Sequence, residues 1–488
     1  MSTDKSETPS ARYAPLAVWI ITVATLVFIA FKVITYGYIP AGDARRHVAK
    51  AFTDRTYSEI IVLTPEYGTD QSPGWDWILH QLHVATGWDR DKLISFSVVS
   101  LLLCVFGAAL PFVRRPEAWL LALLAQMVAI PELMTRWTQA RPFLLTEAVL
   151  IAILFAWSKA GERISGWKII FTTIGVALSV CIHGTWYLWA LPLAAFFLAG
   201  AWRRLVGLTC CVMAGVLLGG LMTGKPFVFL KASVSMVTLV FKEHVPQWML
   251  VGEFQPSYGE FATVILVAVV YLWRRQRIAA EPKWFRQPVV WMFVICWILG
   301  FKADRFWADW GLPAAVVWLT LQFEEIFEGI WNVTSPKRVV LCLLVAAPLF
   351  LDATNDLGRR YTNCLEETFL NGADPALKYW VPDDHGIFYT AQMDCFYNTF
   401  YANPTAPWRY VLGMEPAMMT PENLEIFRGI QRAHYAHGAY EPWVEKIKKN
   451  PEDRMMILSG GQPNIAELEW TNAAGNIWIG RPLRTKEK

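Results

Sequence analysis

One short segment places a carboxylate among cationic side chains at helical spacing. In the segment 42–50, GDARRHVAK, the side chains of Asp43, Arg46, His47 and Lys50 are three or four positions apart, so a helix would present them as one polar stripe. A carboxylate flanked by cations stays ionised and can accept a proton from a hydroxyl group or bind a metal ion. A structural explanation is also open, because Gly-Asp is an ordinary start signal for an amphipathic helix.

Two apolar stretches further along carry isolated ionisable groups. In the segment 135–150, TRWTQARPFLLTEAVL, Glu147 lies one to two turns into a predicted helix, after Arg136 and Arg141. A carboxylate below the lipid headgroups is costly unless it is paired or functional. The two arginines are candidate partners, and a structural ion pair explains Glu147 as well as catalysis does. His183 ends another apolar run beside a glycine, which lets a ligand or another backbone approach.

A third cluster stands between two late apolar runs, in the segment 301–314, FKADRFWADWGLPA. Lys302 and Arg305 are three residues apart and would face the same way on a helix, as recognition of a phosphate requires. Snorkelling to the membrane surface is the alternative for Lys302, but it explains Arg305 and the neighbouring Asp304 and Asp309 less well.

The composition indicates that these groups are held by membrane-spanning helices. The chain has 488 residues, of which 55% are hydrophobic and only 17% charged, whereas soluble chains carry about a quarter charged residues. These values argue against a cytosolic enzyme, a disordered scaffold and a receptor with a single anchor. The net charge of +3 is too small for a nucleic-acid-binding protein.

Apolar runs of suitable length predict about eleven crossings, the first a retained signal anchor. The runs lie at 15–37, 93–113, 117–134, 143–158, 168–188, 188–202, 205–223, 259–273, 288–302, 308–327 and 338–352. With a cytoplasmic amino terminus, the arginine and lysine clusters at 114–115, 159–168, 203–204, 274–286 and 337–338 all lie inside, as the positive-inside rule requires. Arg359-Arg360 is the one pair that runs against this orientation.

Two large segments then lie outside: the first loop, about 38–92, and the polar segment 353–488. We expect a helical membrane domain over 1–352 and a small extracytoplasmic α+β domain over 353–488, with a hairpin around 472–475. The apolar loop 224–258 is expected to hold an interfacial helix. Cys364 and Cys395 both fall in the outer domain, where an oxidising compartment favours a disulfide between them.

The order of these motifs resembles the membrane glycosyltransferases of the GT-C class, in particular the branch with protein O-mannosyltransferases and lipid A aminoarabinose transferases. The resemblance covers roughly residues 15–350 and rests on three segments. These are GDARRHVAKAF followed by DQSPGWDWILHQLHVATGWDRDKL, then HGTWYLWALP, and finally KADRFWADWGLP. The family's first motif is an Asp-Glu pair, but Ala44 replaces the second acid here, and Arg141-Pro142 stand where another acid is often found. Glu147 is then the candidate second acid, and a divalent metal is a candidate cofactor whose ligands are not assigned.

The resemblance implies transfer of a sugar from a polyprenyl-phosphate donor, with inversion, to a lipid, glycan or protein acceptor at the outer face of a bacterial inner membrane. Asp43 would be the general base. By this resemblance, Arg46, His183, Lys302 and Arg305 would bind the departing phosphate, and Arg141 is a weaker candidate for the same role. His47 is a further candidate substrate-binding residue. Two alternatives remain open: a transporter or flippase for a lipid-linked glycan, and a non-catalytic assembly partner that has lost the second acid. An internal repeat would favour a transporter, and none is evident.

Overall fold

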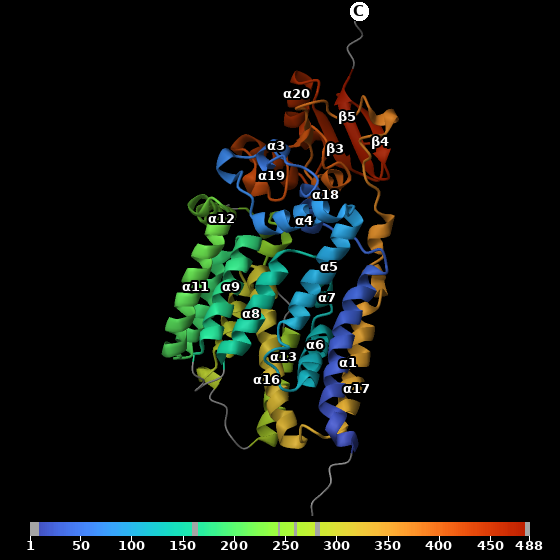
Figure 1. Cartoon of the computed structure of the whole chain (residues 1–488). Helices are drawn as coiled ribbons and strands as arrows, with labels where there is room; N and C mark the ends of the chain where they lie inside the picture. The colour runs from blue at the N-terminus through green and yellow to red at the C-terminus, as the bar shows by residue number, and fades with distance from the viewer. Residues whose placement is uncertain (1–8, 159–163, 243–244, 258–260, 279–283, 484–488) are drawn as a thin grey trace, which may run out of the picture.

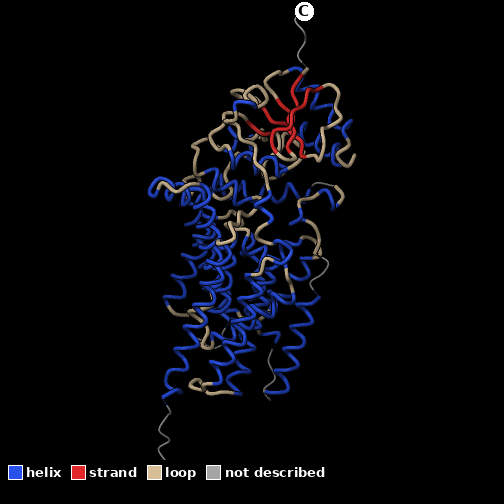
Figure 2. Tube along the Cα trace, turned by 90° about the vertical axis from the view of Figure 1, so that its right-hand side faces the viewer, coloured by secondary structure: helices blue, strands red, loops and turns tan. Residues whose placement is uncertain are grey.

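The computed structural model describes residues 9–158, 164–242, 245–257, 261–278 and 284–483. A bundle of helices carries a smaller domain at one end, and the sheet lies within that domain (Figures 1 and 2). The amino-terminal helix begins at the far end of the bundle, so both segments predicted to lie outside gather at the opposite end (Figure 1).

Every predicted apolar run falls on a helix of the bundle. These helices are α1 (Pro9–Ile34), α5 (Arg90–Gly107), α6 (Pro116–Ala129), α8 (Phe143–Ser158), α9 (Gly166–Ile182), α10 (Ala190–Leu198), α11 (Trp202–Met222), α13 (Phe261–Arg277), α14 (Pro288–Gly300), α16 (Leu312–Ile330) and α17 (Lys337–Thr354). The predicted interfacial segment contains α12 (Pro226–Lys242), which lies at the end of the bundle nearest the smaller domain (Figure 1).

Fewer of these helices are long enough to span a membrane than the sequence predicts. Within the described ranges, two have the necessary length and apolarity, Tyr13–Ile34 and Trp202–Met222. A third span results if α6 and α7 (Glu132–Thr138) count together, although the pair is bent by 111° at the Ile130-Pro131 step, where proline cannot continue a helix. The apolar helices support a membrane location, while the number of eleven crossings stays a prediction.

The smaller domain is built around one mixed sheet. Its five strands run in the order β2 (Arg409–Tyr410), β1 (Ile387–Tyr389), β3 (Arg454–Leu458), β5 (Ile477–Pro482) and β4 (Leu468–Ala474). The first three are parallel, and the last three are antiparallel. The helices α18 (Met393–Ala402), α19 (Pro421–Arg432) and α20 (Glu441–Lys449) complete the predicted α+β composition. The predicted hairpin is confirmed at the β4–β5 turn, where Gly475 has a positive φ of 51°.

The first outer loop packs against both the bundle and the smaller domain and does not stand alone. It forms α2 (Asp43–Lys50), α3 (Tyr57–Ile60) and α4 (Pro73–Thr86). Tyr57 and Ile60 pack in one hydrophobic cluster with Phe396 and Tyr410. The backbone N–H of Val62 donates a hydrogen bond of 2.8 Å to the carbonyl oxygen of Tyr410, which adds an isolated bridge beside β2. Segments separated by more than 300 residues thus share one core.

The predicted disulfide between Cys364 and Cys395 is wrong in this structure, where both thiols are free and buried. Cys364 belongs to the main core of the bundle, and its Sγ accepts a hydrogen bond of 3.3 Å from the backbone N–H of Ile39. Cys395 packs instead in the cluster of the smaller domain. The two cysteines therefore lie in different hydrophobic cores.

Candidate active site

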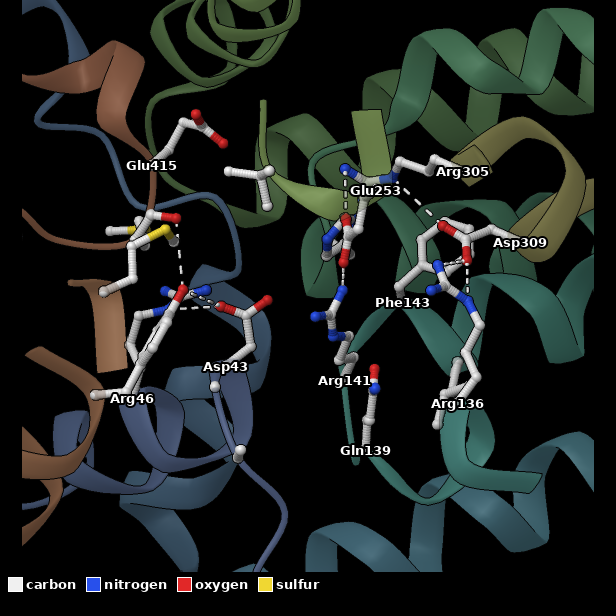
Figure 3. Close-up of a pocket in the computed structure, with 18 of the residues that line it drawn as sticks. Asp43, Arg46, Arg136, Gln139, Arg141, Phe143, Glu253, Arg305, Asp309 and Glu415 are labelled. Carbon is white, nitrogen blue, oxygen red and sulfur yellow. Dashed lines mark hydrogen bonds and ion pairs between the residues drawn. The ribbon is translucent and has the colours of Figure 1, made fainter. Parts of the chain in front are cut away.

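A cavity of about 540 Å³ lies where the bundle meets the smaller domain. Its wall combines the start of α2, the connection between α7 and α8, the segment after α9, part of α12 and the start of α18. Figure 3 shows two groups of charged side chains facing one another across this space, with Asp43 and Arg46 on one side and three arginines on the other. Each group has its own network of contacts.

The arginine group consists of Arg136, Arg141 and Arg305, which share two carboxylates (Figure 3). Arg136 Nε donates a hydrogen bond of 2.8 Å to Asp309 Oδ1, and Arg305 Nε lies 3.3 Å from Asp309 Oδ2. Glu253, on the 3-10 turn Gly252–Phe254, forms an ion pair with Arg141 and lies 3.7 Å from Arg305 Nη1. Three guanidinium groups thus face two carboxylates, which leaves this side of the cavity with a net positive charge.

Asp43 is the first residue of α2 and follows Gly42, whose φ of 75° suits glycine. Arg46 Nε donates to Asp43 Oδ1 over 3.2 Å, and the hydroxyl of Tyr397, from α18, donates to the same oxygen over 3.4 Å. Burial raises the pKa of Asp43, but the charges of Arg46 and Arg141 outweigh it and hold that pKa well below 3.8. Asp43 is therefore ionised across the physiological range.

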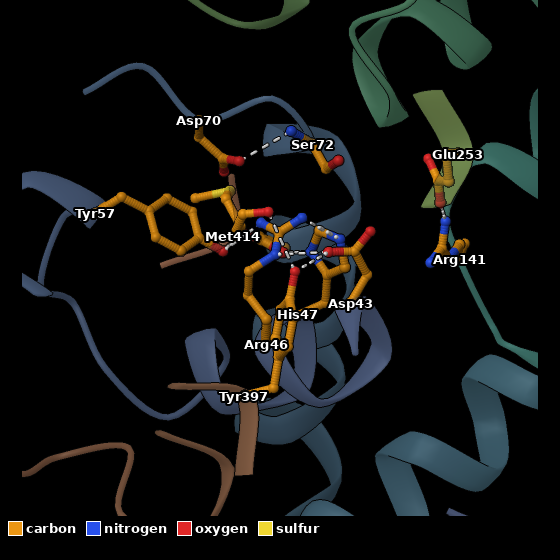
Figure 4. Close-up of polar contacts among 11 residues, drawn as sticks. Asp43, Arg46, His47, Tyr57, Asp70, Ser72, Arg141, Glu253, Tyr397 and Met414 are labelled. Atoms are coloured by element: carbon orange, nitrogen blue, oxygen red, sulfur yellow. Dashed lines mark hydrogen bonds and ion pairs between the residues drawn. The ribbon is translucent and has the colours of Figure 1, made fainter. Parts of the chain in front are cut away.

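A buried polar network lies beneath Asp43 and fixes Arg46 (Figure 4). Arg46 Nη1 donates to the hydroxyl of Tyr57 over 2.9 Å, and Arg46 Nη2 lies 3.0 Å from His47 Nε2. Because arginine can only donate, His47 Nε2 must be the acceptor, so its proton is on Nδ1, which donates to Asp76 Oδ1 over 2.5 Å. Tyr57 in turn donates to Asp76 Oδ2 over 3.2 Å.

Burial shifts the pKa values of all three titratable groups in this network, His47, Asp70 and Asp76. Burial, with a smaller contribution from Arg46, lowers the pKa of His47 to about 3, so the imidazole is neutral near pH 7. Burial raises the pKa of Asp76 to about 6, and burial together with the charge of Asp76 raises the pKa of Asp70 to about 7. Asp76 is therefore mostly ionised near pH 7, so the guanidinium of Arg46 lies between two carboxylates, Asp43 and Asp76.

Most of the residues selected from the sequence line this one cavity. They are Asp43, Arg46, Arg141, Glu147, His183 and Arg305. His47 lies behind the wall and contacts Arg46 instead. Lys302 is exposed and is not among the lining residues, because α14 ends at Gly300 and the next helical turn begins at Asp304. The expectation that Lys302 and Arg305 share a helix face is therefore wrong.

Two further candidates have other partners than expected. Glu147 accepts a hydrogen bond of 3.1 Å from Trp137 Nε1, while the arginines predicted to pair with it bind Asp309 and Glu253. Burial and, to a lesser degree, the charge of Arg305 lower the pKa of His183 well below 6.5. His183 can therefore offer a phosphate a neutral N–H group and no positive charge.

The sequence reasoning missed Glu253 and Tyr397. Glu253 stands in a segment expected to be interfacial, and Tyr397 is one of sixteen tyrosines, in a domain whose fold the sequence does not define. Neither has a local motif that signals its role. In the ranges that the structure describes, no group of three or more His, Cys, Asp or Glu side chains is placed to hold a metal ion.

No protein-family profile and no curated protein matches this sequence. Among solved structures, ArnT from Cupriavidus metallidurans in the apo state is similar over 95% of this chain and 97% of its own, with a TM-score of 0.56 and 12% identity. The same protein bound to undecaprenyl phosphate is similar over 96% and 98%, with a TM-score of 0.55 and 12% identity. An oligosaccharyltransferase from Archaeoglobus fulgidus overlaps less, over 88% of this chain and 67% of its own, with a TM-score of 0.47 and 11% identity. The likeness to ArnT extends over both domains, and it shows that this chain shares the overall fold of that protein.

Proposed function

We propose that this protein is a membrane glycosyltransferase that moves a sugar from a polyprenyl-phosphate donor to an acceptor hydroxyl at the outer face of a bacterial inner membrane. One observation carries the proposal: an ionised carboxylate, Asp43, faces three arginines across a single cavity. Such a cavity combines a proton acceptor with a site for an anionic leaving group. The fold supports the choice of donor, since the similar ArnT was crystallised with undecaprenyl phosphate.

Asp43 would act as the general base. As the acceptor oxygen attacks the anomeric carbon, its proton passes to Asp43, the bond between sugar and phosphate breaks, and the configuration inverts. A strongly acidic carboxyl group is a weak base. However, the charge of Arg141 helps to depress the pKa of Asp43, and a bound phosphate would neutralise part of that charge. Loading of the donor would thus raise the basicity of Asp43.

The lipid phosphate would leave from the opposite side of the cavity. Arg136, Arg141 and Arg305 present forked donors to it, and charge-assisted hydrogen bonds of this kind are about twice as strong as neutral ones. His183 would add a neutral N–H group. Lys302 has no part in this arrangement. Arg46 binds Asp43 directly, so its role in this proposal is to orient the base.

The test is release of polyprenyl phosphate from a labelled lipid-linked sugar by purified protein in detergent, in the presence of candidate acceptors. Asp43→Asn should lower turnover by about 10²- to 10⁴-fold, the usual contribution of a general base. Asp54→Asn is the matched control, because it makes the same change at an exposed position of the same loop and should be neutral.

Near-normal transfer by Asp43→Asn would remove the assignment of the base. If the unmodified protein binds the donor but releases no phosphate with any lipid, glycan or peptide acceptor, it is not the proposed enzyme. The transporter and assembly-partner alternatives both predict that result.

A further inference from the structure

Glu253 occupies the position between two of the proposed phosphate-binding arginines (Figure 3). One of its carboxylate oxygens pairs with Arg141 Nη1, and the other lies 3.7 Å from Arg305 Nη1. The side chain of Glu253 is 17% exposed, so the contact is largely shielded from solvent. An anion is therefore already bound where the leaving group of the proposed reaction must bind.

The carboxylate does not satisfy the donors around it. Arg141 Nε is buried and has no hydrogen-bond acceptor, and Arg305 Nε has only its ion-pair contact of 3.3 Å with Asp309 Oδ2, which does not meet hydrogen-bond geometry. Leaving a buried donor unpaired costs about 1–3 kcal/mol in general. A carboxylate offers two oxygens, whereas polyprenyl phosphate, the monoester released in the proposed reaction, offers three at its terminus. The donor itself is a diester with two free oxygens, and its lipid and sugar supply the additional binding contacts. The site thus fits a phosphate better than it fits Glu253.

The turn that carries Glu253 has open space beside it and is anchored by the residues that precede it. Gly252 precedes it, and a methyl group added there would meet nothing within 4 Å. The same connection is held at Met249, whose carbonyl oxygen accepts a hydrogen bond of 2.9 Å from Arg428, and at Trp248, whose ring stacks on His434 at 5.2 Å. Displacement of the Glu253 carboxylate would leave both of these anchors in place.

We propose that Glu253 is a built-in competitor that occupies the phosphate subsite of the unloaded protein and is displaced when a polyprenyl-phosphate group binds. The inference rests on the proposed function and specifies how its donor site is kept closed to other anions. Only an anion that offers more contacts than a carboxylate, or that is held by an attached lipid, would displace Glu253. The alternative is that Glu253 is a permanent strut that holds Arg141 and Arg305 in place for the phosphate.

The two roles predict opposite effects on binding. The experiment measures the dissociation constant of undecaprenyl phosphate for the purified full-length protein in detergent, by quenching of tryptophan fluorescence. Under the competitor role, Glu253→Gln and Glu253→Ala should both bind about tenfold more tightly, since the phosphate no longer competes with two charged contacts. Under the strut role, both variants should bind more weakly. Unchanged binding would also overturn the proposal.

Removal of any negative charge from the cavity favours an anion, so a control for net charge is needed. Asp394→Asn provides it, because Asp394 lines the same cavity while its charged neighbours are Glu367 and Arg45. The Asp394→Asn change should tighten binding by no more than about threefold, as expected for a screened interaction in a wet cavity. If the Asp394 and Glu253 variants gain equally in affinity, the effect is one of net charge alone, and the proposed displacement of Glu253 is wrong.

The same titrations separate this inference from the proposed function. If the unmodified protein and all the variants fail to bind undecaprenyl phosphate, the donor class itself is wrong, and the inference falls with it. If the unmodified protein binds and the Glu253 variants do not improve, only the inference fails. Binding that appears only in the two Glu253 variants would support both.

Discussion

Replacement of Asp76 by asparagine tests whether the buried network beneath Asp43 positions the proposed base. Asp76 Oδ2 accepts a hydrogen bond of 3.2 Å from Tyr57, and its Oδ1 accepts one of 2.5 Å from His47. Asparagine has nearly the same shape but only one acceptor oxygen, so it can keep one of these two bonds. Tyr57 and His47 are the two groups that hold the guanidinium of Arg46, and Arg46 in turn holds Asp43.

The expected effect follows from the loss of one bond in a buried network. Leaving a buried polar group unpaired costs about 1–3 kcal/mol. If Arg46 is displaced and all of this free energy is lost from the stabilisation of the transition state, kcat falls by roughly 5- to 150-fold. The loss should appear in kcat, since Asp76 touches none of the three arginines proposed to bind the donor. The KM for the lipid-linked sugar should change by less than about threefold. Steady-state release of polyprenyl phosphate measures both parameters.

A conservative variant on the other side of the same bond gives the control. Tyr57→Phe removes the hydroxyl that donates to Asp76, so it should reproduce the loss of kcat, and the double variant should be little worse than either single one. Additive losses would show that the two residues act separately. A normal kcat for Asp76→Asn, or a loss confined to KM, would refute the positioning role.

Two further predictions concern stability, measured by thermal unfolding in detergent. The pKa of Asp70 is raised from 3.8 to about 7, so the folded protein favours the protonated carboxyl group. The stability that this preference contributes is fully present below pH 3.8 and is lost as the pH rises through 7. Between pH 5 and pH 8, the stability of Asp70→Asn should therefore gain about 2–3 kcal/mol relative to the unmodified protein, because the two diverge over about two pH units at about 1.4 kcal/mol each. A gain independent of pH would contradict this assignment. Arg338 forms two contacts of 2.6 and 2.9 Å with Glu117, at exposures of 1% and 0%. Arg338→Met should cost about 3–5 kcal/mol, because the buried carboxylate of Glu117 would keep, within the described ranges, only its 3.8 Å contact with Arg115. Adding Glu117→Leu should recover part of that loss, since it removes the buried charge but also the contact of Arg115; equal stability of the single and double variants would argue against the buried pair.

The helices of the bundle could be predicted from the sequence because their signals are local. Each run of apolar residues is a helix, and Pro116 and Pro288 begin two of them at the first helical position. The bend after α6 is also local in origin, since Pro131 follows Ala129 by two residues, but its angle depends on what the two halves pack against. The number of crossings depends on a membrane that the sequence does not contain.

The site could be predicted only where its residues are neighbours in the chain. The contact between Asp43 and Arg46 joins residues three positions apart and is expected from helical spacing. The partner of Arg141 is Glu253, more than a hundred residues away, and not the nearby Glu147. The Lys302 expectation failed for a local reason, because the three-residue rule applies only within a continuous helix, and the chain leaves the helix between Gly300 and Asp304.

The placement of Tyr397 shows why the smaller domain belongs to the site and is not merely a cover. Its hydroxyl reaches Asp43 from α18, over a sequence separation of 354 residues. On the same side of the cavity, Arg45 of α2 donates to Asn398 of α18, and its guanidinium pairs with Glu367 over 2.5 Å. The proposed base is thus held between a helix of the first loop and a helix of the carboxy-terminal segment. A change in how the smaller domain docks would therefore move Asp43, so the orientation of the proposed base depends on the contacts between α2 and α18.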